Sequence, residues 1–294
     1  MTSRGQMTIM APEKVPDEQP PRFSVVIPAY NEEALIGDCL ASLARQDFPG
    51  RVEVIVVDNN CTDRTAEIAR ACGATVASEE ARGVCPARQR GTLLAQGEIV
   101  ISTDADTTFG PGWLSRIDRA FRDDPELVAV AGPCRFVDAP LWGRIYTWAL
   151  FGLVHLISRV TGRIPYVSAT NIAFRRSAWD GYDTRATQGG DEVGLMRRLR
   201  SRGRIAFDLG NPTFTSSRRL YRGLVYNIFV TCLFYYALGY WLNRIFGRQL
   251  IGMAPSFRGE APQPLGRRGV GRVVIAGVCL VVFLVLGRYT VDLG

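Results

Sequence analysis

The chain has 294 residues, of which 47% are hydrophobic, and its 35 basic against 28 acidic side chains give a net charge of +7. This composition excludes a disordered protein and fits one large folded domain, alone or with an appendage, while the basic charge is compatible with phosphorylated substrates, anionic lipid or nucleic acid. The seven cysteines contain no Cys-x-x-Cys pair and the single histidine lies in an apolar run, which argues against a zinc site, a disulfide framework and a Ser-His-Asp hydrolase.

The first 21 residues combine several prolines and mixed charges with no apolar segment. This pattern predicts a flexible tail and not a signal peptide, so we expect the main body to fold in the cytoplasm.

From residue 22 to about residue 110, short apolar strands alternate with helices. Strands are expected at 23–27, 52–57, 75–77 and 98–102, and helices at 32–45, 64–72 and 87–96. Such alternation predicts an α/β fold with a mostly parallel sheet flanked by helices. In such sheets, ligands bind beyond the carboxyl ends of the strands.

Residues 111–219 are less regular, and we assign them to the second half of one domain that extends over residues 22–219. Strands are expected at 127–131 and 169–174, and helices at 142–158 and 191–202. In the last of these segments, apolar residues recur at near-helical spacing and arginines cover the remainder, which is typical of a helix with one buried face.

Beyond residue 219 the sequence changes character. Residues 224–246 are rich in aromatic side chains with one charge, at Arg244, and residues 273–286 form a charge-free apolar run. Five arginines lie between these segments, which predicts that the linker stays in the cytoplasm. We therefore expect residues 220–294 to form membrane-associated helices. The segment 224–246 is expected to be an interfacial helix or a re-entrant hairpin, and only 273–286 is a candidate span. Two core helices of a soluble domain are the alternative.

Acidic residues follow two of the expected strands. Asp58 ends the segment 52–57, and Asp104-Ala105-Asp106 follows 98–102. In an extended strand, residues i and i+2 share a face, so Asp104 and Asp106 are expected to point the same way. Two such carboxylates suit Mg²⁺ or Mn²⁺, whose remaining ligands are commonly water and the phosphates of a nucleotide. Taken alone, an Asp-rich turn without a ligand is an equally good interpretation.

Three segments together resemble the family 2 glycosyltransferases, which are inverting enzymes of the GT-A fold. The segments are Val-Val-Ile-Pro-Ala-Tyr-Asn-Glu at 25–32, Val-Val-Asp-Asn-Asn-Cys-Thr-Asp-Arg-Thr at 56–65, and Asp104-Ala105-Asp106. Their order and spacing are far more specific than any one of them, and the resemblance extends over about residues 23–219. It implies a nucleotide-sugar donor and Mn²⁺ or Mg²⁺ as cofactor.

The resemblance also implies roles for individual residues. The donor-binding positions that match the family are Pro28, Ala29, Tyr30, Glu32, Asp58, Arg88, Asp104, Arg218 and Arg219. Asp104 and Asp106 match the metal positions, where a cation stabilises the charge that grows on the diphosphate leaving group. Arg88 lies in a motif in which Gln89 replaces the usual Asn. Arg218 and Arg219 match a late basic motif that closes over the diphosphate.

An inverting transfer needs a base that accepts the proton of the acceptor hydroxyl. The family takes it from a Glu-Asp-x-x-Leu motif, whereas this chain has Asp191-Glu192-Val193-Gly194-Leu195, with the two acids reversed. Alignment on the leucine favours Glu192, and a shift of one residue favours Asp191, so both are candidate bases. An acid at a helix N-terminus is also explained by the helix dipole alone.

The sequence therefore predicts a metal-dependent inverting glycosyltransferase at the cytoplasmic face of the cell membrane, with a lipid or lipid-linked acceptor. The alternative is a membrane-anchored protein that binds a sugar nucleotide without turnover, which the reversed acids would favour. The chain lacks the Gly-rich motifs of nucleotidyltransferases and dehydrogenases. Its arginines alternate with acids and form no recognised nucleic-acid motif, so no nucleic-acid partner is expected.

Overall fold

A computed structural model of the chain describes residues 20–184, 191–218, 220–246 and 250–251. Two compact units divide these residues: 20–184 and 191–216 belong to the first, and the described residues from 217 onward belong to the second. The apolar run 273–286 and all but the last two residues of the expected N-terminal tail lie outside the described residues.

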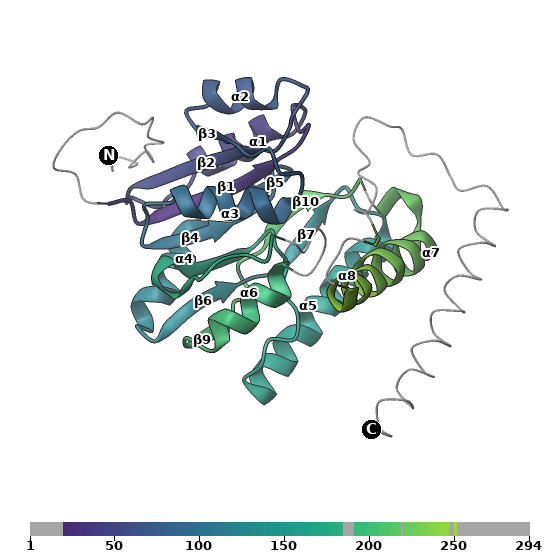
Figure 1. Ribbon diagram of the computed structural model, residues 1–294. Coiled ribbons are helices and arrows are strands. Elements are labelled where there is room, and N and C mark those ends of the chain that lie inside the picture. Colours follow the sequence, from purple (N-terminus) through teal and green to yellow (C-terminus); the bar gives the residue numbers. More distant parts are fainter. Residues whose placement is uncertain (1–19, 185–190, 219, 247–249, 252–294) are drawn as a thin grey trace. The chain divides into compact units, whose positions relative to one another are not determined.

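The first unit contains a seven-stranded sheet with the strand order β3-β2-β1-β4-β8-β6-β9 (Figure 1). The strands are β1 (Phe23–Ala29), β2 (Val52–Asp58), β3 (Thr75–Ser78), β4 (Ile99–Ser102), β6 (Leu127–Ala131), β8 (Ile172–Arg175) and β9 (Arg204–Phe207). All neighbouring pairs are parallel except those that β8 makes with β4 and with β6. The predicted α/β class with a mostly parallel sheet is therefore confirmed.

Three short strands form a second sheet in the order β5-β10-β7. They are β5 (Thr107–Phe109), β7 (Cys134–Val137) and β10 (Thr213–Ser216). The sequence analysis did not predict these strands or β9, because, unlike β1, β2, β4 and β6, none of them is a continuous apolar run. This sheet brings β10 alongside the segment that directly follows Asp104-Ala105-Asp106.

Six α-helices accompany the two sheets in the described part of the first unit. They are α1 (Ile36–Ala44), α2 (Thr65–Ala71), α3 (Val84–Leu94), α4 (Trp113–Asp123), α5 (Leu141–Thr161) and α6 (Asp191–Arg200). Helix α4 was not predicted. The expected helix at 32–45 starts only at Ile36, because residues 32–35 form a turn in which the N–H groups of Leu35 and Ile36 both donate to the Glu32 carbonyl.

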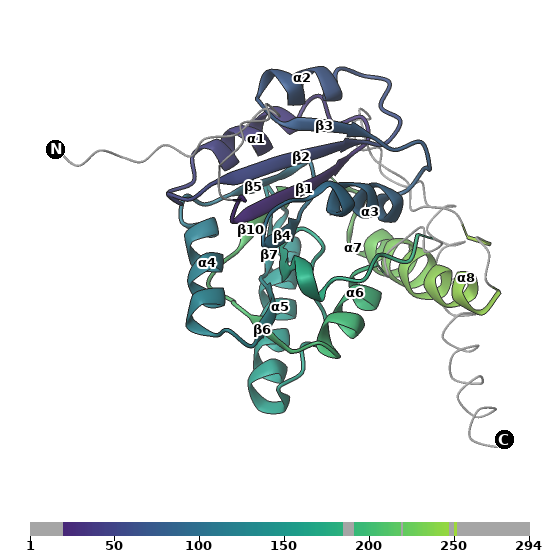
Figure 2. The ribbon, with the colours of Figure 1, turned by 60° about the vertical axis from the view of Figure 1, so that its left-hand side comes forward.

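The alternating side chains of β1 divide the core into two layers. Val25 and Ile27 pack with the apolar face of α1 and with Trp113 of α4, whereas Val26 packs with Ala87 of α3 and with residues of α6. Figure 2 accordingly shows α4 on one side of the strands and α3 and α6 on the other. Strands covered on both faces are expected to be continuous apolar runs, as they are here.

Gly91 brings α3 unusually close to the sheet. A Cβ at this position would lie 2.4 Å from Cγ1 of Val26 and 2.9 Å from Cγ2 of Val57, so no larger residue fits without movement of the helix. Arg88 lies one helical turn earlier on the same face. The close packing therefore carries the Arg88 side chain to the sheet.

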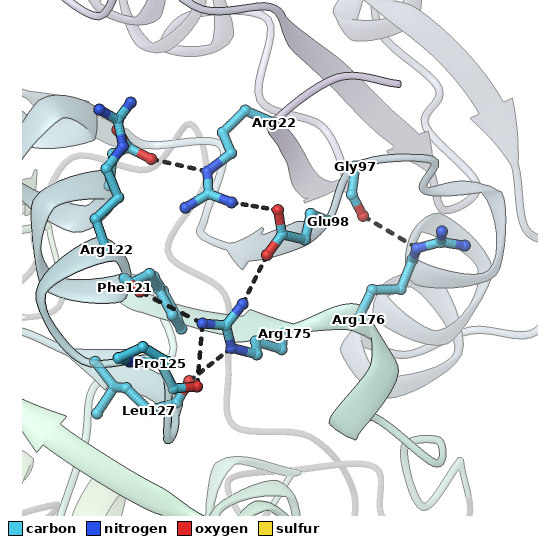
Figure 3. Close-up of polar contacts among 10 residues, drawn as sticks. Arg22, Gly97, Glu98, Phe121, Arg122, Pro125, Leu127, Arg175 and Arg176 are labelled. Carbon is cyan, nitrogen blue, oxygen red and sulfur yellow. Dashed lines mark hydrogen bonds and ion pairs between the residues drawn. The ribbon is translucent and has the colours of Figure 1, made fainter. Parts of the chain in front are cut away.

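An ion network holds the edge of the sheet that lies opposite the carboxyl ends of β1 and β4 (Figure 3). Arg22, just before β1, pairs with Glu98, just before β4, and donates to Asp118 of α4 at 2.8 Å. Arg175 at the end of β8 pairs with the same Glu98 at 2.6 Å and lies over the Phe121 ring. These contacts fix where three central strands begin or end.

The second unit is helical in its described part. It contains η2 (Leu220–Arg222), α7 (Leu224–Tyr226), the π-helical stretch η3 (Asn227–Gly239) and α8 (Tyr240–Phe246). None of the helices that the structure describes combines the length and the apolar character that a membrane crossing requires. The candidate span at 273–286 lies outside the described residues, so the expected membrane association of residues 220–294 stays a prediction.

Candidate active site

The parallel strands bring the predicted donor-binding turns to one edge of the sheet. Ala29 at the end of β1 pairs with Asp58 at the end of β2, and the N–H of Thr103 after β4 donates to the carbonyl of Val26 at 3.2 Å. The turns after β1, β2 and β4 therefore begin side by side, as the strand pattern predicted.

Hydrogen bonds connect the turn after β1 to the start of α2. Asn31 adopts a φ of 51°, its Oδ1 accepts the Thr62 N–H at 2.7 Å, and the N–H of Glu32 donates to Thr65 Oγ1 at 2.8 Å. Asparagine tolerates this left-handed conformation better than most residues. Of the predicted donor-binding residues here, Ala29 and Glu32 are buried, and Pro28 and Tyr30 are half-buried.

The second turn is closed by Asp58 and held in place by Asn59. Asp58 Oδ1 accepts the N–H of Cys61 at 2.8 Å. The Asn59 amide donates to the carbonyls of Glu79 and Ala81, each at 2.8 Å, and accepts the N–H of Gly83 at 2.8 Å. Asn59 thus connects this turn to the loop before α3. The sequence analysis missed its role, although an Asn-Asn pair directly after a buried strand signals a structured turn.

The two acids of Asp104-Ala105-Asp106 lie in a turn and not in an extended strand. Strand β4 ends at Ser102, and the Asp104 carbonyl accepts the N–H of Thr107 at 3.2 Å. Because the strand ends before Asp104, its alternation does not set the directions of the two side chains, and the expectation that both point the same way stays a prediction. Their placement depends instead on separate partners.

Arg88 and Thr215 are the hydrogen-bond partners of Asp104 and Asp106. Arg88 Nη2 donates to Asp104 Oδ1 at 2.7 Å, and Thr215 Oγ1 donates to Asp106 Oδ1 at 3.1 Å. The N–H of Ser216 adds a bond to the Asp106 carbonyl at 3.3 Å. Arg88 is 3% exposed, whereas the Asp104 side chain is 36% exposed. A buried arginine needs a counter-charge, so the ion pair fixes the orientation of Asp104 from the protein side.

Two buried cysteines beside the acids are held in the thiol form. Burial, together with the charges of Asp106 and Asp104, raises the pKa of Cys39 far above its usual range. Burial and the charge of Asp104 raise the pKa of Cys134 to about 11. Mg²⁺ and Mn²⁺ also prefer oxygen ligands to sulfur, so the carboxylates are the candidate ligands here.

The carboxylates nevertheless fit a cation that a nucleotide helps to bind. Among the residues that the structure describes, no group of three or more His, Cys, Asp or Glu side chains is arranged to hold a metal ion. Mg²⁺ and Mn²⁺ need no complete protein cage, since one or two carboxylates are commonly completed by phosphates and water. Asp104 and Asp106, both partly exposed, supply such a set.

The acceptor half is joined to this edge through buried hydroxyl and amide groups. Thr103 Oγ1 donates to the Thr170 carbonyl at 2.8 Å. Asn171, only 3% exposed, accepts the indole N–H of Trp113 at 3.1 Å and donates to the Asn211 carbonyl at 2.8 Å. These contacts fix the start of β8 beside β4. Sequence reasoning did not identify them, because the partners are far apart in the chain.

Helix α6 begins at the candidate bases, as predicted. Glu192 is half-buried in its first turn, while the side chain of Asp191 and residues 185–190 lie outside the described part of the chain. The choice between the two acids therefore stays a prediction.

The segment that contains Asp180 and Tyr182, before α6, is held by contacts with both α6 and α3. Arg198 of α6 pairs with Asp180 at 2.8 Å, and Gln89 Oε1 of α3 accepts the N–H of Tyr182 at 2.7 Å. Gln89, which replaces the family's asparagine, thus connects the helix that carries Arg88 to the segment that leads toward the bases. The sequence analysis noted the replacement and missed this contact.

The late basic motif is described only in part. Thr215 and Ser216 contact Asp106 as described above, Arg218 belongs to the second unit, and Arg219 lies outside the described residues. The predicted contact of Arg218 and Arg219 with a diphosphate therefore stays a prediction.

The mostly parallel sheet flanked by helices, with acidic turns at one edge, is an α/β fold of the GT-A type. The sequence pattern of glycosyl transferase family 2 matches residues 24–182, which is more than half of the chain. The chain therefore belongs to glycosyl transferase family 2 and is a glycosyltransferase, as the motifs predicted.

Curated relatives are similar over about a third of the chain. A dolichyl-phosphate hexose transferase from Haloferax volcanii is 37% identical over 107 residues, 36% of this chain and 46% of that protein. An N-acetylglucosaminyltransferase from Rhizobium leguminosarum bv. viciae is 31% identical over 121 residues, 38% of this chain and 28% of that protein. The similar region is thus less than half the length of each relative.

Solved structures share the fold over most of the chain. The mannosyltransferase PcManGT from Pyrobaculum calidifontis, in complex with GDP-Man and Mn²⁺, is similar with a TM-score of 0.60 at 21% identity, over 96% of this chain and 82% of that chain. TarS 1–349 from S. aureus, in complex with UDP, has a TM-score of 0.54 at 23% identity, over 77% and 72% of the two chains.

Proposed function

We propose that this glycosyltransferase binds a nucleotide-sugar donor at the carboxyl ends of β1, β2 and β4 and transfers the sugar with inversion. The observation that carries the proposal is the arrangement of Asp104 and Asp106. Arg88 orients the first acid and Thr215 the second, beside the turn that contains Asp58. The complexes of TarS with UDP and of PcManGT with GDP-Man and Mn²⁺, two proteins that share the fold, support a nucleotide-sugar donor.

The donor-binding residues act at different parts of the nucleotide in this proposal. The turn of Pro28, Ala29, Tyr30 and Glu32 contacts base and ribose, and Asp58 contacts the edge of the base. Arg88 holds Asp104 against the ribose, and Arg218 and Arg219 bind the diphosphate, for which an arginine fork is well suited.

Asp104 and Asp106 would hold Mn²⁺ or Mg²⁺ together with the diphosphate of the donor. The cation, when bound, stabilises the negative charge of the leaving diphosphate. The presence of Mn²⁺ in the PcManGT complex supports this choice of metal.

On the acceptor side, Asp191 or Glu192 at the start of α6 accepts the proton of the attacking hydroxyl. The acceptor is a lipid or a lipid-linked molecule, and the enzyme works at the cytoplasmic face of the cell membrane with residues 220–294 associated with the membrane. The similarity to a dolichyl-phosphate hexose transferase supports this acceptor class.

Thermal unfolding with a panel of donors tests the proposal. Purified protein is heated with Mn²⁺ and UDP-, GDP- or dTDP-sugars, and the matching donor is expected to raise the melting temperature. A ligand at 100 times its Kd stabilises by about 2.7 kcal/mol. Asp106→Asn, which keeps size and hydrogen bonding, should reduce the metal-dependent gain and abolish transfer. If no donor raises the melting temperature, the proposal is wrong.

The same experiment, together with an assay of donor cleavage, distinguishes sugar transfer from the second candidate function, which is binding without turnover. The reversed order of Asp191 and Glu192 favours a protein that binds a sugar nucleotide without turnover. A donor that raises the melting temperature but is never cleaved, with any lipid acceptor offered, would support that alternative.

A further inference from the structure

Helix α5 carries an apolar stripe on the side that faces away from the core of the first unit. Its members are large hydrophobic side chains that the fold leaves exposed: Leu141, Ile145, Trp148, Leu153, Leu156 and Val160. Trp148 is 79% exposed and Val160 is 77% exposed. Most members recur at intervals of three or four residues, so they lie along one side of a helix about 30 Å long.

The opposite face of α5 is the one that packs against the rest of the first unit. Gly143, Thr147, Phe151 and Val154 are buried, and the Phe151 ring stacks near Phe207 of β9 with 6.2 Å between centroids. A surface helix normally presents polar residues opposite such a face. The α5 stripe therefore contributes nothing to the core, and a contiguous exposed patch of this kind marks an interaction surface.

The charges on α5 and on the loop that follows it are of one sign. No Asp or Glu occurs between Asp138 and Asp180, whereas Arg144, Arg159 and Arg163 are exposed on α5 or just after it. Arginine stems lie along an apolar surface while their guanidinium groups reach anionic headgroups. Exposed Trp148 and Tyr146 add the aromatic character that is typical of helices at a membrane interface.

We propose that the α5 stripe docks on an anionic phospholipid bilayer, with the helix lying in the plane of the interface. This surface belongs to the first unit and is distinct from the C-terminal segment 220–294. Helix α5 follows directly after β7, which pairs with β10, the strand whose Thr215 holds Asp106. Docking would thus bring the membrane to the acceptor half, a consequence that rests on the proposed lipid acceptor.

Charge also argues against the apolar run 273–286 as the occupant of the stripe. That run is flanked by Arg267, Arg268, Arg272 and Arg288. These would meet the arginines of α5 as like charges, which are unfavourable neighbours.

Fluorescence of Trp148 in the full-length chain tests the proposal. Vesicles of phosphatidylcholine and phosphatidylglycerol in equal amounts carry bromine on the acyl chains, which quenches a tryptophan that enters them. Subtraction of the signal from a Trp148→Phe variant isolates Trp148. We expect it to be quenched by anionic vesicles and much less by phosphatidylcholine alone.

A charged variant with a matched control completes the test. The double variant I145E/L156E places acids on both sides of Trp148 and should need at least about tenfold more lipid for the same quenching. Leu93→Glu, at an exposed leucine on α3, should behave as the unmodified chain. A melting temperature that still rises with the donor verifies that each variant is folded and reports separately on the proposed function.

Three outcomes would overturn the proposal. The first is an absence of Trp148-specific quenching by anionic vesicles. The second is equal lipid dependence of I145E/L156E and Leu93→Glu. The third is protection of Trp148 from aqueous acrylamide before lipid is added, which would assign the stripe to this chain's own C-terminal segment or to a second copy.

Discussion

At the scale of single residues, the site depends on side chains that hold other side chains. Arg88 is buried and pairs with the partly exposed Asp104, and Thr215 holds Asp106 from a strand more than a hundred residues later. An aspartate that follows a strand has many accessible rotamers, and each partner removes most of them. Such preorganisation keeps the ligand oxygens ready for a cation and a nucleotide.

Replacement of Arg88 by alanine should therefore affect stability and donor binding together. Loss of a hydrogen bond to a charged group, with a partly buried carboxylate left behind, is expected to cost about 2 kcal/mol of unfolding free energy. Urea unfolding measures this cost, and the donor-induced rise in melting temperature should shrink. Arg90→Ala, at an exposed arginine two residues later on the same helix, is the control and should be close to neutral.

At the scale of elements, one side chain, Asp63, accepts hydrogen bonds both from the start of α2 and from the turn after β1. Asp63 Oδ1 accepts the N–H of Thr65 at 3.0 Å and its hydroxyl at 2.6 Å, and Asp63 Oδ2 accepts the N–H of Glu33 at 3.1 Å. Burial alone would raise the pKa of Asp63, but the bonds from Thr65 and Glu33 outweigh it and lower that pKa. The carboxylate therefore stabilises both α2 and the turn after β1.

This lowered pKa predicts a pH-dependent effect of Asp63→Asn. Because the folded-state pKa is depressed, the stabilisation is present above the unfolded pKa of about 3.9 and is lost as the pH falls through the folded value. At neutral pH the variant should be less stable by about 1 kcal/mol, because hydrogen bonds to a charged carboxylate are stronger than those to a neutral amide. Urea unfolding should show this difference at pH 7 and a much smaller one near pH 3. A difference that is independent of pH would contradict the role of the charge.

At the scale of the whole molecule, the first unit couples its donor half to its acceptor half through a few long-range contacts. Gln89 of α3 binds the backbone of Tyr182, and Arg198 of α6 binds Asp180. The helix that carries Arg88 and the helix that begins at the candidate bases are thereby fastened to the same short segment. The distance between donor and base depends on this connection.

Gln89→Ala should therefore slow transfer while donor binding is retained. A displacement of about 1 Å at the base can reduce a rate by up to about a hundredfold, since the reacting groups must be aligned. We expect kcat to fall by about tenfold or more, whereas the donor-induced rise in melting temperature stays as in the unmodified chain. Gln89→Glu, which keeps an acceptor oxygen for the Tyr182 N–H, should recover most of kcat. Equal losses in both variants would contradict the positioning role.

Much of the fold could be predicted from local sequence patterns. The buried strands β1, β2, β4 and β6 appear as continuous apolar runs, and their order relative to the helices predicted a mostly parallel sheet. The short strands β5, β7 and β10 escaped notice because each depends on a partner distant in the chain. Helix α5 was predicted at residues 142–158, but the sequence did not indicate which of its faces would be buried.

By itself, the sequence determined the family, the α/β class and the acids that follow β2 and β4, because short-range periodicity and motif spacing are properties of the chain alone. Only the tertiary structure decided that Asp104 and Asp106 sit in a turn, that Arg88 and Thr215 orient them, and that an apolar side of α5 is left exposed. These features arise from contacts between segments far apart in the chain, where the partner is chosen by packing and by the need to satisfy buried polar groups.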